Sequence, residues 1–131
     1  TYTSDNGSRW ESGDKVTSNL LNGIAFGNNI FVAVGASGTL IKSTNNGGTF
    51  SVGVSEVTTT LNSITYGNSI FVAVGSNTVI ASTDNTGSTF GIKATTYTFE
   101  DVTYGNGVFV AVGNKIIYKS TDGNTWTKVY P

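Results

Sequence analysis

One adjacent pair of acidic residues, Glu100-Asp101, is the first place where catalysis could reside, because glycoside hydrolysis needs two carboxylates that converge on one bond. Neighbouring residues of a β-strand point to opposite faces of the sheet, so we do not expect these two side chains to converge. The sequence has no His and no Cys, which removes thiol nucleophiles, Ser-His pairs and the usual zinc and haem ligands. We therefore predict that the chain is not an enzyme and uses no cofactor or metal.

Four short polar segments, at residues 3–10, 43–50, 82–90 and 120–126, share a pattern of two hydroxyl residues, an Asp or Asn, a Gly and a final aromatic residue. The carboxylate or amide oxygen can accept hydrogen bonds from N–H groups of its own turn, while Gly adopts a left-handed conformation. The pattern predicts a structural role for eight residues: Asp5, Asn45, Asp84, Asp122, Trp10, Phe50, Phe90 and Trp126. A calcium loop is the alternative, but each turn has at most one carboxylate and no distal Glu.

The composition indicates which elements must carry these turns. Of 131 residues, 17 are Gly and 37% are hydrophobic, whereas only 11% are charged, and Ser, Thr and Asn dominate the polar remainder. Such a mixture favours short strands and tight turns over helices. The 7 basic residues are scattered along the chain, which argues against a nucleic-acid groove, and no apolar run is long enough for a membrane span. We predict an all-β protein.

An internal repeat organises the chain. The segment at residues 21–35 returns at 61–75 and again at 99–113, at intervals of 40 and 38 residues, which is the length of a four-stranded propeller blade. In the second copy we expect a first strand from Leu61 to Tyr66, a hairpin turn at Gly67-Asn68, and a second strand from Ile70 to Val74. That second strand is apolar at every position, which predicts cover on both faces by neighbouring blades. Third and fourth strands are expected at residues 79–82 and 90–93.

The polar turns between the third and fourth strands resemble the Asp-box, S-x-D-x-G-x-T-W, of the bacterial neuraminidase-type repeat. The resemblance covers essentially the whole chain and implies a β-propeller, as in sialidases, photosystem assembly factors and many bacterial and phage surface proteins. A sialidase would need three arginines around a carboxylate, but this chain has only Arg9, which lies inside one of the turns. The resemblance therefore implies a member that is not a sialidase.

The repeats predict a propeller segment of three and a half blades in residues 1–131. A half-blade of third and fourth strands occupies residues 1–20, and complete blades occupy 21–60, 61–98 and 99–131. Closed propellers usually have four or more blades, and open blade ends expose strand edges and apolar faces. We expect both ends to contact other polypeptide, either copies of the chain or the rest of a longer propeller.

Loops between the second and third strands and between successive blades share one face of a propeller. Their sequences vary while the strands repeat, which is how binding residues are usually arranged. We predict that the ligand-binding residues are Asn19, Ser37, Asn77, Tyr97 and Lys115. The alternative is that these are only polar loops.

We predict a non-catalytic binding module that recognises a glycan or a protein through these loops, on a cell or virion surface or elsewhere outside the cell. The alternative is a structural building block of a larger assembly, such as a viral tail, a capsid ornament or an extracellular filament. The absence of Cys is compatible with an extracellular location but does not require one.

Overall fold

The hairpin of strands β7 (Leu61–Gly67) and β8 (Ile70–Gly75) is the basic unit of the fold. Asn68 and Ser69 connect the two strands and have φ values of 46° and 62°, the left-handed conformation that suits a two-residue hairpin turn. The same hairpin recurs as β3 (Leu21–Gly27) with β4 (Ile30–Gly35), and as β11 (Phe99–Gly105) with β12 (Val108–Gly113). The expected first and second strands are therefore confirmed. The turn expected at Gly67-Asn68 lies one residue later, because Gly67 still pairs with Ile70.

The computed structural model describes residues 1–131, except for the side chain of Ala94. Each hairpin is extended by two more strands into an antiparallel four-stranded sheet. We call these sheets blade 1 (β3–β6), blade 2 (β7–β10) and blade 3 (β11–β14). The added strands are β5 (Leu40–Ser43), β6 (Ser51–Val52), β9 (Thr78–Ser82), β10 (Phe90–Ala94), β13 (Ile116–Ser120) and β14 (Thr127–Tyr130).

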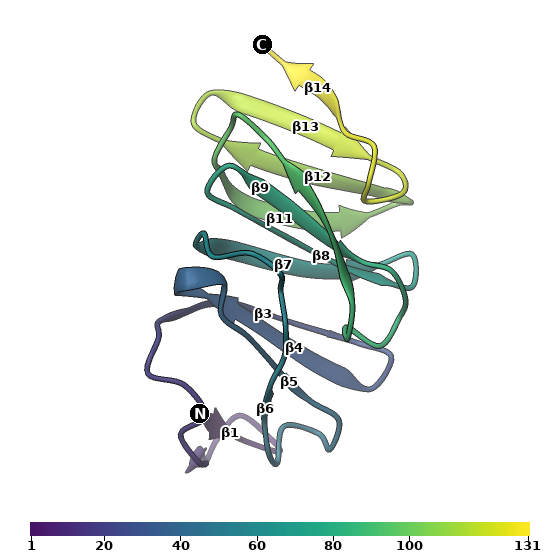
Figure 1. Cartoon of the computed structure of the whole chain (residues 1–131). Helices are drawn as coiled ribbons and strands as arrows, with labels where there is room; N and C mark the ends of the chain where they lie inside the picture. Colours follow the sequence, from purple (N-terminus) through teal and green to yellow (C-terminus); the bar gives the residue numbers. More distant parts are fainter.

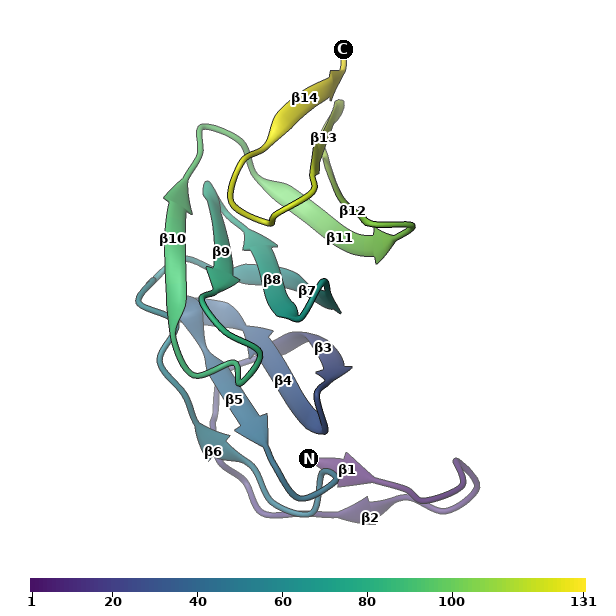
Figure 2. The ribbon, with the colours of Figure 1, turned by 90° about the vertical axis from the view of Figure 1, so that its right-hand side faces the viewer.

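The blades follow one another in an arc, with the N-terminal sheet at one end and the C-terminal strand at the other (Figure 1). A two-stranded sheet, the half-blade, consists of β1 (Tyr2–Thr3) and β2 (Glu11–Ser12) and precedes blade 1. Figure 2 shows the sheets fanning out, and the first strands β3, β7 and β11 contact one another in turn. This all-β arrangement of antiparallel blades confirms the predicted fold class. A short 3-10 turn, η1 (Ala36–Gly38), is the only helical element among the described residues, so none of them lies in a helix that could span a membrane.

Each first strand contains a β-bulge, which corrects one expectation from the sequence. The register shifts between Leu21 and Gly23, between Leu61 and Ser63, and between Phe99 and Asp101. Glu100 is therefore the extra residue of a bulge, so the regular alternation assumed for Glu100-Asp101 is wrong. Bulges of this kind occur where a strand must bend and redirect a side chain.

The core lies between blades. The face of blade 2 that points to blade 1, which we call its rear face, carries Leu61, Ile64, Phe71, Ala73, Ile80 and Phe90. These residues pack against the forward face of blade 1, formed by Ile30, Val32, Val34 and Leu40. The same arrangement joins blades 2 and 3, where Phe99, Val102, Phe109 and Ala111 cover Val72, Val74 and Val79. Two equivalent interfaces therefore hold the described chain together by burying apolar side chains.

The prediction that every second strand is covered on both faces is confirmed for β8 but wrong for β12. Residues 71–75 of β8 are all buried, because blades lie on both sides of them. On β12 the forward-facing Val108 and Val110 are only half-buried, and Val112 is 38% exposed. No described blade covers the forward face of blade 3.

Candidate functional site

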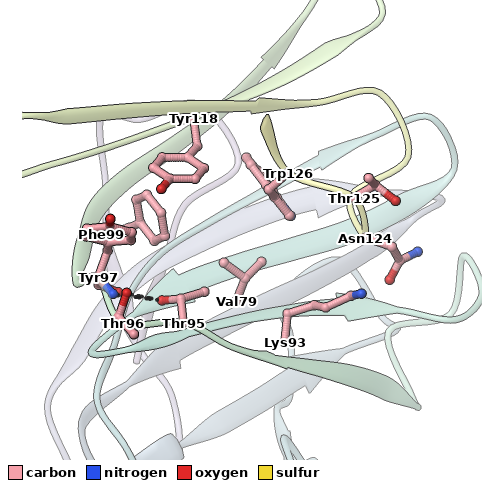
Figure 3. A pocket seen from close by; sticks show the side chains of 10 residues that line it. All are labelled: Val79, Lys93, Thr95, Thr96, Tyr97, Phe99, Tyr118, Asn124, Thr125 and Trp126. Carbon is pink, nitrogen blue, oxygen red and sulfur yellow. Dashed lines mark hydrogen bonds between the residues drawn. The ribbon is translucent and has the colours of Figure 1, made fainter. Parts of the chain in front are cut away.

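A groove at the junction of blades 2 and 3 brings together four aromatic residues, Tyr97, Phe99, Tyr118 and Trp126 (Figure 3). Its volume is about 380 Å³. The buried Val79 and Phe99 form its apolar base, and three larger side chains, Tyr97, Tyr118 and Trp126, surround this base. Its polar rim consists of Lys93, Thr95, Thr96, Asn124 and Thr125. We call this site the inter-blade groove.

Packing between aromatic rings fixes the walls of the groove. The ring centroids of Tyr97 and Tyr118 are 5.5 Å apart, and Tyr118 also meets Phe99 edge-to-face at 5.5 Å. The Lys128 ammonium lies 5.9 Å from the centroid of the Tyr97 ring, within the range of a cation–π interaction. Tyr97 therefore contacts an aromatic ring and a cation of blade 3, although it lies in the loop between β10 and β11.

Local hydrogen bonds orient two of these aromatic residues. The Thr95 hydroxyl donates to the Tyr97 carbonyl at 2.6 Å, and Tyr97 N–H donates to the Thr95 hydroxyl oxygen at 3.3 Å. The Trp126 indole N–H donates to the Gly123 carbonyl at 2.9 Å. A ring whose only polar atom is already bonded presents an apolar face to the groove.

The electrostatics of the groove favour neutral ligands or ligands with a weak negative charge. Partial burial, with smaller contributions from hydrogen bonding and from the charge of Tyr97, raises the pKa of Tyr118 above its ordinary value. Tyr118 is therefore a neutral hydroxyl at physiological pH. The described lining of the groove includes no carboxylate, and Lys93 is its one cation. Such a site can bind by stacking and hydrogen bonding, but it offers no acid–base pair.

Two of the five loop residues expected to bind a ligand lie at or beside the groove. Tyr97 lines it directly. Asn77 lies in the β8–β9 turn, where its carbonyl accepts a hydrogen bond from Thr95 N–H at 2.9 Å and its side-chain oxygen is 3.5 Å from the Thr98 hydroxyl. The turn at Asn77 therefore supports the loop that carries Tyr97.

The other three predicted residues lie elsewhere along the arc. The Asn19 amide donates to the Thr39 hydroxyl at 2.7 Å, next to η1, which contains Ser37 with a φ of 55°. Lys115 has a φ of 58° in the turn between β12 and β13 and is exposed. Neither Asn19, Ser37 nor Lys115 lines the inter-blade groove.

Most of the groove was missed by reasoning from the sequence. The polar-turn pattern predicts a structural role for Trp126, and no sequence pattern singles out Tyr118 or Lys93. One feature of the sequence indicates the groove: the residue types of the last repeat differ from those of the other two at positions that line it. Tyr118 stands where earlier copies have Ile41 and Ile80, and Trp126 stands where they have Phe50 and Phe90.

The Asp or Asn of three polar turns accepts hydrogen bonds within its own turn. Asp122 Oδ1 accepts from the N–H groups of Asn124 at 2.8 Å and Thr125 at 2.7 Å, and from the Ser120 hydroxyl at 2.9 Å. The N–H groups of Thr125 and Asn124 lower the pKa of Asp122 from 3.8 to about 2. In the preceding turn the hydroxyl and N–H of Thr86 lower the pKa of Asp84.

Asn45 has the same geometry without a charge. Its Oδ1 accepts from Thr49 N–H and from the Ser43 hydroxyl, both at 2.9 Å. In the first turn, by contrast, Ser4 and Asn6 supply the acceptors, which bond Gly7 N–H and Ser8 N–H at 2.9 Å. Asp5 is therefore not the residue that organises its turn.

The final aromatic residues of the turns differ in their surroundings. Phe90 is buried between blades, Phe50 is half-buried, and Trp126 lines the inter-blade groove. Trp10 is 60% exposed, and its indole N–H donates to the Gly7 carbonyl at 3.2 Å. One repeat position thus contributes to the core in blade 2 and to the lining of the inter-blade groove in blade 3.

No protein-family model matches the chain, and neither does any curated protein. Its structure is similar to that of YCF48 bound to D1 peptide, at 19% identity and a TM-score of 0.78, over 98% of this chain and 45% of that chain. It is also similar to YCF48 from Cyanidioschyzon merolae, at 18% identity and a TM-score of 0.72, over 86% of this chain and 40% of that chain. For the computationally designed Ika4 protein the identity is 12% and the TM-score 0.56, over 91% of this chain and 99% of that chain. This chain spans less than half the length of either YCF48 chain, and the likeness shows that it has the β-propeller fold.

Proposed function

We propose that this chain is a non-catalytic binding module whose ligand occupies the inter-blade groove. One observation carries the proposal: Tyr97, Tyr118 and Trp126 converge on a single groove with a neutral polar rim and one cation, Lys93. Aromatic side chains supply large rigid contact area, and the hydroxyl groups around them orient a ligand.

A protein ligand, presented as a peptide segment, fits this groove best. A volume of about 380 Å³ accommodates one or two side chains of a peptide, and Lys93 can pair with an acidic group beside them. The similarity to YCF48 bound to D1 peptide is a further support, because that propeller accommodates a peptide. A glycan is the second candidate, since Tyr97 and Trp126 offer ring faces beside the hydroxyl and amide groups of Thr96 and Asn124.

The setting that we propose is a cell or virion surface, as the resemblance of the polar turns to Asp-boxes implies. The structural alternative, a building block of a larger assembly, is favoured by a different observation. Apolar side chains are exposed at both ends of the arc, with Ile24 at 58% and Val112 at 38%.

Screening the full chain against a peptide array and a glycan array tests this function. The best hit is then titrated against the wild type, against Tyr97→Ala, and against Tyr2→Ala, a control tyrosine that is 71% exposed and outside the groove. We expect Tyr97→Ala to weaken binding about tenfold, the effect of losing one aromatic contact, while Tyr2→Ala leaves it unchanged. If the hit binds Tyr97→Ala with the same affinity as the wild type, its binding site is not the inter-blade groove.

A further inference from the structure

Strand β10 has an unpaired edge beside the inter-blade groove. It pairs with β9 along Phe90–Ala94 without a register shift, and among the described strands none pairs with its other edge. Lys93 of β10 and the residues that follow the strand, Thr95, Thr96 and Tyr97, line the groove. Figure 2 shows β10 on the outer side of the arc, with blade 1 on one side and blade 3 on the other. This edge is therefore exposed because β10 is the outer strand of its own blade.

The hydrogen bonds to β9 identify which main-chain groups of this edge are free. Thr95 N–H donates to the Asn77 carbonyl at 2.9 Å, which continues the register of the β9–β10 ladder. Hydrogen-bonded pairs alternate with non-hydrogen-bonded pairs along an antiparallel ladder. Lys93, two residues before Thr95, therefore bonds to β9, whereas Ile92 directs its N–H and C=O away from β9. A strand added to this edge would bond to Ile92.

The two other outer strands of the blades differ from β10 in ways that hinder strand addition. β6 is only two residues long, and the pairing of β14 with β13 contains a register shift. Short edge strands and bulges are devices by which proteins protect the edges of their sheets. β10 has five residues in regular register, and its central Ile92 is 47% exposed. Of the three outer edges, β10 is therefore the one best suited to accept another strand.

The side chains of β10 determine the chemistry of the occupant. Lys93 lies on the forward face of blade 2 and lines the inter-blade groove. Ile92 pairs with Ile80 and lies with it on the rear face. The one ion pair among the described residues, between Arg9 and Glu11, does not involve Lys93. A strand on β10 would therefore meet a cation without a carboxylate partner on one face and an exposed apolar side chain on the other.

We propose that the peptide ligand of the inter-blade groove binds as a fifth strand of blade 2, antiparallel to β10, with an acidic residue opposite Lys93 and an apolar residue opposite Ile92. This inference rests on the proposed function and adds to it the binding mode and the residue pattern of the ligand. Antiparallel addition is the more stable, because one ligand residue can exchange both hydrogen bonds with Ile92. Main-chain hydrogen bonds supply part of the affinity, and the alternating side chains give the selectivity.

A second copy of the chain, paired through its own β10, is a poorer occupant. Antiparallel pairing of two β10 strands centred on Ile92 would make the two Lys93 side chains diagonal neighbours on one face. Long side chains reach each other across this diagonal, and like charges repel. An acidic residue of a separate peptide attracts Lys93 instead. Self-association is therefore a competing outcome of the test below.

The probe is a fluorophore-labelled peptide, Ser-Thr-Glu-Val-Tyr-Thr-Ser, whose Glu can lie opposite Lys93 when its Val lies opposite Ile92. Two versions of the peptide, each with one methylated backbone nitrogen, test the strand addition. Methylation at Val removes the N–H that would donate to the Ile92 carbonyl. Methylation at Glu is the matched control, because that N–H would point away from β10.

Variants of the full chain test the same contacts from the other side in anisotropy titrations. Ile92→Pro removes the free N–H of the edge and keeps the bonds to β9, since proline is tolerated where an edge N–H faces solvent. Its matched control is Val52→Pro, at the same repeat position of β6, where Val52 is 71% exposed. Lys93→Glu reverses the charge, and a peptide with Lys in place of Glu tests for rescue. Circular dichroism establishes that each variant is folded, and sedimentation measures the state of the unliganded chain.

We expect methylation at Val and Ile92→Pro each to weaken binding by about tenfold or more, because each removes a main-chain hydrogen bond. Methylation at Glu and Val52→Pro should leave binding unchanged. Lys93→Glu should weaken binding of the Glu peptide, and the Lys peptide should bind this variant more tightly than it binds the wild type.

The possible contrary results separate this inference from the proposed function. If methylation at Val and Ile92→Pro have no effect but Tyr97→Ala weakens binding, the inter-blade groove remains the site and strand addition is wrong. If none of these changes weakens binding, the peptide binds elsewhere and strand addition to β10 is wrong. Failure of the peptide to bind the wild type would also overturn strand addition, while the array hits still test the groove. A wild-type dimer that Ile92→Pro converts to a monomer, and that the peptide does not dissociate, would mean that β10 pairs with a second copy.

Discussion

The ring of Tyr66 in blade 2 lies directly on Gly27 of blade 1, so closely that a methyl group on Gly27 would overlap the ring. Tyr104 of blade 3 has the same relationship to Gly67 of blade 2. Neither glycine has a positive φ, so close approach of the blades, and not backbone conformation, requires glycine here. These contacts occur where the first strands of adjacent blades meet.

Gly67→Ala should lower the free energy of unfolding by about 1–3 kcal/mol, because the new methyl group forces Tyr104 out of its packed position. The matched control is Gly105→Ala at the same repeat position, where nothing lies within 4 Å of the added methyl. We expect the control to change stability by less than about 0.5 kcal/mol. Urea titrations of both variants measure the difference, and equal effects would contradict the packing argument.

Asn62→Ala should lower stability by about 1 kcal/mol, since Asn62 sits in the β-bulge of blade 2 and its amide donates to the Phe99 carbonyl of blade 3 at 2.8 Å. Asn22 makes the equivalent bond to the Leu61 carbonyl at 2.9 Å. Glu100→Ala, at the exposed third bulge, is the control and should be nearly neutral. Thermal unfolding followed by circular dichroism compares the two. A neutral Asn62→Ala would mean that the bond between blades contributes nothing.

Phe71→Ala should cost about 3–5 kcal/mol, because the Phe71 side chain is fully buried between blades and its removal leaves a cavity. Phe31→Ala removes the same side chain at the same repeat position, where it is only half-buried, and should cost distinctly less. Phe71→Leu, which retains most of the volume, keeps the comparison measurable if the alanine variant does not fold. If denaturant titrations show that Phe31→Ala lowers the free energy of unfolding more than Phe71→Ala does, β8 is not the strand that is buried on both faces.

Asp122→Ala should lower stability at pH 7 by about 1 kcal/mol through the loss of local hydrogen bonds. Because folding lowers the pKa of Asp122 from 3.8 to about 2, the stabilisation is present above pH 3.8 and is lost as the pH falls towards 2. The stability difference between wild type and Asp122→Ala should therefore shrink over this interval.

Asp122→Asn is the conservative control, since Asn45 forms the equivalent bonds without a charge. Urea titrations at several pH values should find it closer to wild type at neutral pH than the alanine variant. If the difference in unfolding free energy between wild type and Asp122→Ala stays constant down to pH 2, the carboxylate does not stabilise its turn.

Strands and turns could be predicted because their signals are local. The apolar run at residues 70–74 and the turn signal at Gly67-Asn68 predict a hairpin from local backbone preferences, and the same pattern occurs in all three repeats. The structure places the turn itself at Asn68 and Ser69. The bulges could not be predicted, because Asn62 looks like any polar strand residue until its amide meets a carbonyl of the next blade.

The inter-blade groove depends on contacts that no local pattern contains. Tyr97, Tyr118 and Trp126 come from a loop, a third strand and a turn, and only the packing of blade 3 on blade 2 brings them together. Exposure is decided in the same way, since Leu21 and Leu61 have the same repeat position but differ in whether a complete blade covers them. The sequence by itself thus determined the blade, through the alternation and turn preferences of its own residues. Only the tertiary structure decided which blade faces are buried and which stay exposed, because burial depends on residues far away in the chain.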